Sequence, residues 1–207
     1  MGKTLYTLLL CLALAPATAL AQDSGQTGTD ATEGVVGDST TPDDGGLSLG
    51  TPESDGPQVG DTYVAGEFTD WQLRCVRAED GNDPCQLYQL LADDQGNAVA
   101  EINIFALPAG QEAAAGATVI TPLETLLTAQ LRLAIDGGEA RRYPFAFCTQ
   151  IGCYARLGFR AEEIEQLKRG ASGTVTLVSA ALPTEPVALK VSLSGFTAGW
   201  NALSGAQ

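Results

Sequence analysis

The sequence feature that most constrains the fold is a short loop bounded by two cysteines, Cys148 and Cys153. An aromatic run, Tyr143-Pro-Phe-Ala-Phe, enters this loop, and an apolar run, Tyr154-Ala-Arg-Leu157, leaves it. Short apolar and aromatic runs that are bounded by turns are typical of β-strands. We call the loop 148–153 the clasp, and we expect much of the downstream chain to form strands around it.

Two further cysteines, Cys75 and Cys85, bring the number in the expected mature chain to four. An even number of cysteines in an exported chain indicates disulfides. Three pairings are open, and we favour the local one, in which Cys75 pairs with Cys85 and Cys148 with Cys153. Bridges across loops this short contribute about 2–3 kcal/mol each, so they brace a fold rather than create it. A redox role for the clasp is the alternative; dithiol oxidoreductases usually place two residues between their cysteines, whereas the clasp has four.

The first 21 residues predict a secretory signal. Lys3 precedes the apolar run 5–15, and small residues lead to a cleavage site after Ala21. That run is too short to span a bilayer, and no later segment is long enough, so we expect no transmembrane anchor in the mature chain. Cys11 lies within the signal, and Leu10 before it is too large for a lipoprotein signal. The predicted location is the periplasm or the cell envelope.

Segment 22–61 differs from the rest of the chain. It carries nine acidic residues, no basic residue and no aromatic residue. Such a segment cannot bury enough apolar surface to offset its ordering entropy, so it predicts an acidic disordered linker. Residues 62–207 then form one domain, long enough for a single core. This domain has sixteen acids, ten bases and no basic stripe, so nucleic acid is not an expected partner.

Alternating apolar and polar residues in the domain predict seven or eight short antiparallel strands. The expected strands lie near 71–75, 85–91, 98–106, 119–123, 131–135, 143–147, 175–177 and 187–193. Residues 107–118 are expected to form a loop, and Pro122 is expected to place 119–123 at a sheet edge. Asp136-Gly137-Gly138 predicts a tight hairpin turn with positive φ angles.

One short helix is expected over 161–169, because Ile164 and Leu167 share a face, acids begin it, and Gly170 follows. Short antiparallel strands with one helix predict a mainly β fold, either an antiparallel β-sandwich or a flattened barrel.

Several motifs occur in a characteristic order. They are Trp71 with Cys75, Cys85, Thr121-Pro122-Leu123 leading to Leu131-Arg-Leu-Ala-Ile-Asp136, Phe147-Cys148 with Gly152-Cys153, and Leu193-Ser-Gly195-Phe196. This ordered set resembles the invasion-associated locus B family of exported bacterial proteins, over roughly residues 66–203. The resemblance implies an exported β-rich domain associated with the cell envelope. It supplies no established catalytic residue, and the acidic linker lies outside it.

The sequence offers little for catalysis. It contains no histidine, which removes Ser–His and Cys–His pairs and most zinc sites. Asp80, Asn82 and Asp83 share a loop but lack the calcium-binding pattern, and we expect a solvated turn there. No catalytic residue, metal or cofactor is therefore predicted. The alternative is a small periplasmic hydrolase with paired carboxylates, for which Glu101 and Asp136 are examples.

Three arginines are a candidate anion-binding surface. Strand pairing around the turn at 136–138 should bring Arg132 near Arg141 and Arg142. The export signal, the paired cysteines, the family resemblance and the lack of catalytic groupings together predict a non-catalytic envelope protein. We expect it to bind an unknown envelope protein or surface component.

Overall fold

The computed structural model describes residues 56–205. The predicted signal peptide, its cleavage after Ala21 and most of the predicted linker lie outside these residues. Residues 56–61, which the sequence places in the linker, already contact the domain. Gly60 donates a backbone hydrogen bond to the Arg77 carbonyl, and Arg77 donates one to the Asp61 carbonyl, both at 2.9 Å.

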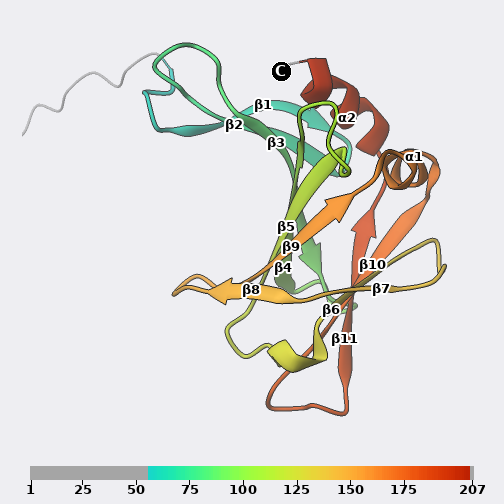
Figure 1. Ribbon diagram of the computed structural model, residues 1–207. Helices are drawn as coiled ribbons and strands as arrows, with labels where there is room; N and C mark the ends of the chain where they lie inside the picture. Colours follow the sequence, from blue (N-terminus) through green and yellow to red (C-terminus); the bar gives the residue numbers. More distant parts are fainter. Residues whose placement is uncertain (1–55, 206–207) are drawn as a thin grey trace, which may run out of the picture. The chain divides into compact units, whose positions relative to one another are not determined.

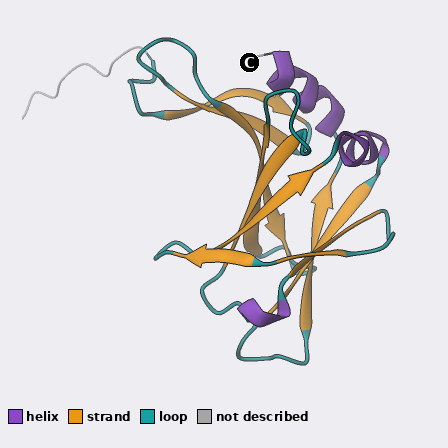
Figure 2. Ribbon diagram, in the orientation of Figure 1, coloured by secondary structure: helices purple, strands orange, loops and turns teal. Residues whose placement is uncertain are grey.

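Two antiparallel sheets form a sandwich (Figures 1 and 2). The larger has seven strands in the order β1-β2-β3-β4-β5-β9-β8. They are β1 (Thr62–Phe68), β2 (Trp71–Val76), β3 (Cys85–Ala92), β4 (Ala98–Ala106), β5 (Ala115–Thr121), β9 (Cys153–Phe159) and β8 (Phe145–Cys148). The smaller has the order β11-β10-β6-β7: β11 (Pro186–Ser192), β10 (Ser172–Val178), β6 (Leu131–Ile135) and β7 (Arg141–Tyr143).

The predicted β-sandwich is confirmed, and the barrel alternative is wrong, because the described strands form two sheets rather than one closed sheet. The described residues contain eleven strands, more than the seven or eight expected. One reason is that β1 alternates weakly between exposed and half-buried residues, so it lacks an apolar signal. Another is that the run 141–148 divides between the two sheets.

This division occurs at Pro144. β7 pairs with β6 at the edge of the smaller sheet, and β8 pairs with β9 at the edge of the larger one. Proline has no backbone N–H to donate to a ladder, which suits it to the corner where the chain leaves one sheet for the other. One continuous segment therefore forms an edge of both sheets.

The core lies between the sheets, and a polar bridge crosses it. Trp71 is buried, and its indole N–H donates to the Ser192 carbonyl at 2.8 Å. The buried Gln89 amide donates to the Ser192 and Asp70 carbonyls and accepts from the Ser192 N–H at 2.8 Å. These bonds tie the larger sheet to β11.

Both disulfides have the local pairing. Cys75 and Cys85 face each other across β2 and β3, and Cys148 and Cys153 face each other across β8 and β9. Each bridge therefore closes the connecting loop at the turn end of a strand pair.

One expectation, about β5, is corrected, and another, about the turn of the smaller sheet, is confirmed. The predicted edge strand 119–123 is wrong: β5 begins at Ala115 and lies centrally between β4 and β9. Its core positions Ala115 and Ala117 are small, so the run resembles a loop in the sequence although it is buried. The predicted tight turn is present, because Asp136 and Gly137 have φ angles of 47° and 70°, and Gly138 donates to the Ile135 carbonyl at 2.9 Å.

The expected helix is present as α1 (Ala161–Arg169), with Ile164 and Leu167 buried. A second helix, α2 (Phe196–Gly205), was missed. It packs on the inner face of β1–β3, and β11 of the smaller sheet also contacts β3. Its buried Phe196 makes an edge-to-face contact with Trp71, with ring centroids 5.3 Å apart.

Candidate functional site

The outward side of the seven-stranded sheet, which we call the open face, has no helix over it. Figure 2 shows α1 and α2 on the side of the smaller sheet. Four large apolar strand residues in the described chain are exposed, Val64, Val76, Leu90 and Phe147, and all belong to this sheet. The strands of the smaller sheet expose none. Apolar surface is therefore concentrated on one side of the sandwich.

An aromatic pair lies at the β8 edge of the open face. The rings of Phe147 and Tyr154 stack with centroids 4.7 Å apart, and the Arg156 guanidinium lies 5.5 Å from the Phe147 centroid. Phe147 is 43% exposed, and Ile151 at the tip of the clasp is 78% exposed. The clasp disulfide holds this strand end in place. The edge therefore presents a fixed aromatic and aliphatic surface next to a cation.

A second arginine–aromatic pair lies on the same face. The Arg74 guanidinium stacks 3.3 Å from the centroid of Tyr88. The cross-strand register places Tyr88, Asn103, Thr118 and Arg156 in one row. Three strand spacings, about 14 Å, therefore separate Tyr88 from Arg156. Neither Arg74 nor Arg156 forms an ion pair within residues 56–205.

A shallow groove of about 320 Å³ lies beside this row. Its apolar lining comes from Leu90, Val99, Ile120, Pro122 and Ile151. The carboxylate-bearing residue at the groove is Glu101, which accepts from the Asn103 amide at 3.2 Å. The groove can hold an apolar side chain while its rim supplies polar contacts.

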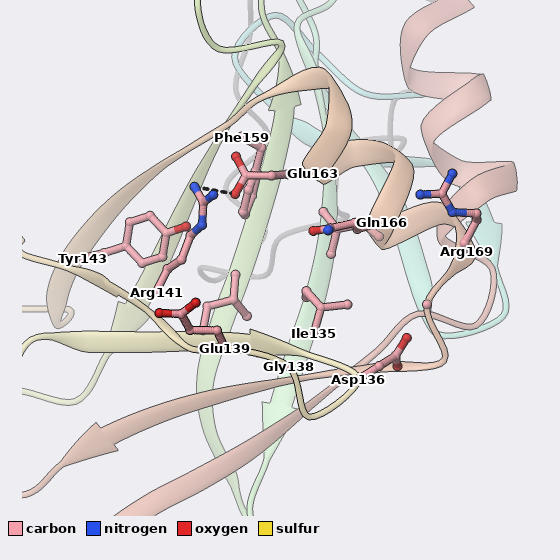
Figure 3. Close-up of a pocket in the computed structure, with 13 residues that line it drawn as sticks. Ile135, Asp136, Gly138, Glu139, Arg141, Tyr143, Phe159, Glu163, Gln166 and Arg169 are labelled. Carbon is pink, nitrogen blue, oxygen red and sulfur yellow. Dashed lines mark ion pairs between the residues drawn. The ribbon is translucent and has the colours of Figure 1, made fainter.

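A separate pocket of about 450 Å³ lies between the β6–β7 hairpin and α1 (Figure 3). Its apolar lining residues are Leu133, Ile135, Phe159 and Leu167. Two sets of bonds connect its walls. The Arg141 guanidinium pairs with Glu163 Oε1 at 2.7 Å, and Asp136 Oδ1 accepts the backbone N–H groups of Ala171 and Ser172 at 3.0 and 2.9 Å.

Two carboxylates of this pocket, those of Asp136 and Glu163, act as hydrogen-bond acceptors. Besides pairing with Arg141, Glu163 accepts the Arg160 backbone N–H at 2.9 Å and so caps α1. Burial, followed by the negative charge of Glu163, raises the pKa of Tyr143 above its usual value, so this phenol is neutral at neutral pH. The contacts fasten the hairpin to the helix, and they do not present a free acid and a free base to a substrate.

The carboxylates named from the sequence do not meet. Glu101 lies on β4 at the open-face groove, whereas Asp136 lies in the β6–β7 turn at the α1 pocket. These residues belong to different sheets and line different hollows. The structure therefore gives no paired-carboxylate site from them.

The structure brings together two of the three arginines named from the sequence. Arg132 and Arg142 are direct cross-strand partners on the outer side of the smaller sheet. Arg141 is the cross-strand partner of Leu133, whose side chain faces the core. Arg141 therefore also points to the inner side of the sheet, away from Arg132 and Arg142, and reaches the α1 pocket. Successive residues of a strand face opposite sides, which is why adjacent arginines separate.

The acidic loop 79–84 is organised by its own contacts. Asp83 accepts from the Ala78 N–H, the Tyr63 hydroxyl and the Arg77 guanidinium, and Asp80 accepts from Asn82. The expected solvated turn is thus a hydrogen-bonded one. No group of three or more acidic, cysteine or histidine side chains suited to a metal occurs within residues 56–205.

The sequence also contained a signal for the open face that we did not use. The aromatic residues Phe147 and Tyr154 flank the clasp directly in the sequence. The outward orientation of Phe147 depends on the bulge between Phe145 and Phe147 in the β8–β9 pairing, whereas Tyr154 faces outward by the regular alternation of β9. That bulge has no signature in residue type.

Fold and surface together define a mainly β, two-sheet sandwich domain with two disulfides and one uncovered sheet face. A family model for the invasion associated locus B (IalB) protein matches residues 71–204, and the chain belongs to this family. The motifs named from the sequence therefore identified the family correctly.

Individual relatives agree with this assignment. The chain is 29% identical over 132 residues to invasion protein B homologs of Brucella abortus strain 2308 and of biovar 1 strain 9-941, covering 63% of this chain and 73% of each relative. The crystal structure of invasion associated protein B from Bartonella henselae superposes with a TM-score of 0.57 at 22% identity. That match covers 68% of this chain and 94% of the other, and it shows a shared fold.

Within residues 56–205, no helix has the length and apolar character needed to cross a membrane.

Proposed function

We propose that this chain is an exported, non-catalytic binding protein of the bacterial cell envelope that binds another envelope protein through the open face. The observation that carries the proposal is the uncovered sheet face with Phe147, Tyr154 and Arg156 at its edge. Aromatic residues and arginine are enriched where protein interfaces bury most of their binding energy.

The geometry supports binding in two ways. The aromatic residues lie on paired strands beside a disulfide, so little conformational entropy is lost when a partner covers them. The guanidinium groups of Arg74 and Arg156 stack on rings without a carboxylate partner in the described chain, so both can bond to acidic groups of a partner. The groove beside Leu90 supplies a place for an apolar anchor.

Export is supported by other features. The first 21 residues have the pattern of a cleaved secretory signal. Both disulfides suit an oxidising compartment, such as the periplasm. Membership of the IalB family is compatible with this location. The acidic linker would then separate the cleavage site from the domain.

The paired-carboxylate hydrolase is the less favoured function. Glycoside hydrolysis needs two carboxyl groups across one cleft, at separations that a substrate or water can fill. Glu101 and Asp136 line different hollows, and Glu163 is held by Arg141 and the α1 cap. None of these arrangements supports an acid–base pair.

The test is site-specific photocrosslinking in intact cells of the native host. A photoreactive residue replaces Phe147 on the open face, and in a matched control it replaces the exposed Thr174 on the outer side of the smaller sheet. We expect one discrete crosslinked partner from position 147 and none from position 174. A second substitution, Arg156→Glu, should reduce the crosslink. Equal crosslinking from both positions, or turnover of a cell-wall or sugar substrate by the purified protein, would disprove the proposal.

A further inference from the structure

The foot of the sandwich, at the end of the domain away from α1, exposes three leucines on two loops. Leu123 and Leu127 belong to the loop 122–130, in which Leu127–Ala129 form the short 3-10 helix η1, and Leu182 belongs to the loop 179–185. Leu123 is 57% exposed and Leu182 is 55% exposed. Figure 1 shows these loops together at the lower end of the smaller sheet. We call this surface the leucine tip.

The leucine tip is held together by backbone bonds. The Leu126 N–H donates to the Val178 carbonyl, and the Ala180 N–H donates to the Glu124 carbonyl, both at 2.7 Å. Thr125 is buried, and its hydroxyl bonds to Thr121 and to the Pro122 carbonyl. The leucines are therefore displayed on a fixed pair of loops rather than on loose ends, and their exposure is built into the fold.

A basic surface begins next to the leucine tip. Arg132 follows the loop 122–130 by two residues, and Arg142 is its cross-strand partner. On β10, the strand that flanks β6 opposite β7, Thr176 pairs with Arg132 and is two residues from the end of the strand. Two strand residues span about 7 Å, so the pair lies close above the loops. Neither arginine forms an ion pair in the described chain.

The strands above the leucine tip contain no acid. β6, β7, β10 and β11 carry Arg132, Arg141, Arg142 and Lys190 but neither aspartate nor glutamate. Lys190 is on the same outer side but farther from the leucine tip, and β10 separates its strand from that of Arg132. The two acids at the leucine tip itself, Glu124 and Glu185, oppose the basic charge locally.

We propose that the leucine tip and the Arg132–Arg142 pair form a docking surface for an anionic phospholipid membrane. Exposed leucines at one rigid end can enter the boundary between headgroups and acyl chains, while guanidinium groups just above them bond to lipid phosphates. The leucines lie at the end of the domain and the arginines lie behind them. In a docked protein, this order places the leucines near the acyl chains and the arginines at the level of the phosphates. The surface is distinct from the open face, so this inference does not depend on the proposed function.

The probe is the purified protein with vesicles of phosphatidylcholine alone or mixed with phosphatidylglycerol, assayed by flotation. We expect binding to the mixed vesicles that weakens as salt increases. The double variant Arg132→Gln/Arg142→Gln should bind roughly 25-fold more weakly, because each basic residue near an anionic surface contributes about fivefold. Leu127→Ser/Leu182→Ser should weaken binding by on the order of tenfold.

Matched controls separate this surface from general charge and general exposure. Arg169→Gln removes an exposed arginine without an ion pair at the end of α1, and Leu90→Ser removes a leucine that is 54% exposed on the open face. Neither should change vesicle binding by more than about twofold. Glu124→Gln should strengthen it. Thermal unfolding of each variant shows that the fold is retained.

Three results would overturn the proposal. One is a protein that binds phosphatidylglycerol vesicles no better than phosphatidylcholine vesicles at low salt. Another is an equal loss of binding in Arg169→Gln and in the double arginine variant. The third is self-association that depends on Leu127 and Leu182, with no vesicle binding, which would assign the leucine tip to a second copy of the chain. Crosslinking at position 147 is unaffected by any of these results, so the two proposals fail separately.

Discussion

Gly195 lies against the backbone of Phe68, so closely that a β-carbon on Gly195 would stand 1.9 Å from the Phe68 carbonyl oxygen. Gly195 also has a φ angle of +84°, which side chains other than glycine rarely adopt. This contact sets the start of α2 directly on the end of β1. The C-terminal helix is thereby joined to the N-terminal strand pair at a point where no side chain fits.

Replacement of Gly195 by alanine should lower the free energy of unfolding by about 3 kcal/mol or more, because the backbone segments must separate. Urea unfolding measures the change. The control is Gly96→Ala, at a similar φ of +86° but with open space around the position, where about 1–2 kcal/mol is expected from conformation alone. Equal losses at the two positions would mean that the close contact with Phe68 has no energetic weight.

Removal of the clasp disulfide by Cys148→Ser/Cys153→Ala should lower the free energy of unfolding by about 2 kcal/mol, from the entropy of the closed loop. Alanine is used at position 153 because that side chain is buried. Unfolding in urea, with the oxidised wild type as reference, gives the value. Unchanged stability together with loss of a thiol–disulfide exchange activity would make the clasp a redox site.

Tyr63 and Asp83 should titrate as a linked pair. The hydrogen bond to the Asp83 carboxylate raises the pKa of Tyr63, while the Ala78 N–H and then the Tyr63 hydroxyl lower the pKa of Asp83. The stabilising contribution of Asp83 is therefore present above the unfolded aspartate value of about 3.9 and is lost as pH falls through the folded pKa. The contribution of Tyr63 is present below about 10 and is lost as pH rises through its raised pKa.

The variant Asp83→Asn should thus move the ionisation of Tyr63 to lower pH and reduce the sensitivity of stability to acid. Phenolate absorbance, with Tyr63→Phe to assign the signal, follows the first effect, and urea unfolding across the acid range follows the second. A Tyr63 titration that is identical in wild type and Asp83→Asn would contradict the pairing.

Glu163→Gln should cost less than about 1 kcal/mol of stability, because its partner Arg141 is largely exposed and the ion pair is screened by solvent. The protein should show no hydrolysis of cell-wall or sugar substrates before or after the change. Gln166→Glu, which adds a carboxylate to the same pocket without touching the ion pair, serves as control. A hydrolytic activity that Glu163→Gln abolishes and Gln166→Glu leaves intact would restore the hydrolase hypothesis.

Deletion of residues 22–55 should leave the stability of the domain and crosslinking from position 147 unchanged, if this segment serves as a spacer. The deletion stops before residues 56–61, because Gly60 and Asp61 bond to Arg77. Urea unfolding and the crosslinking assay are the measurements. Loss of the crosslinked partner with normal stability would instead place recognition in the acidic segment.

Local patterns in the sequence predicted most of the fold. The alternation in 71–75 and 131–135, the positive-φ turn at 136–138 and the capped helix 161–169 are set by near neighbours, and each is present in the structure. The first half of β5 is hard to recognise because its buried residues Ala115 and Ala117 are small and give a weak apolar signal. The face spacing of Phe196, Trp200 and Leu203 indicated α2, but the small and polar residues between them obscured it.

The surfaces were harder to predict, because they depend on how strands are paired in space. Arg132 and Arg142 could be placed together from the hairpin turn, yet the same alternation sends Arg141 to the other side. The leucine tip joins loops that are about fifty residues apart in sequence, and the backbone bonds from Leu126 to Val178 and from Ala180 to Glu124 bring them together. The open face exists because both α-helices and the smaller sheet pack on the opposite side of the seven-stranded sheet. That arrangement follows from the complete fold rather than from any local sequence pattern.

The position of α2 has a consequence for how the molecule is made. The inner face of β1–β3 is covered by the last described helix, so the first strands to be synthesised expose apolar surface until the final residues are available. A partly translocated chain therefore has no way to complete its core. For a protein exported as we propose, this order keeps the polypeptide unfolded during translocation. Cooperative folding then begins only after α2 has crossed the membrane.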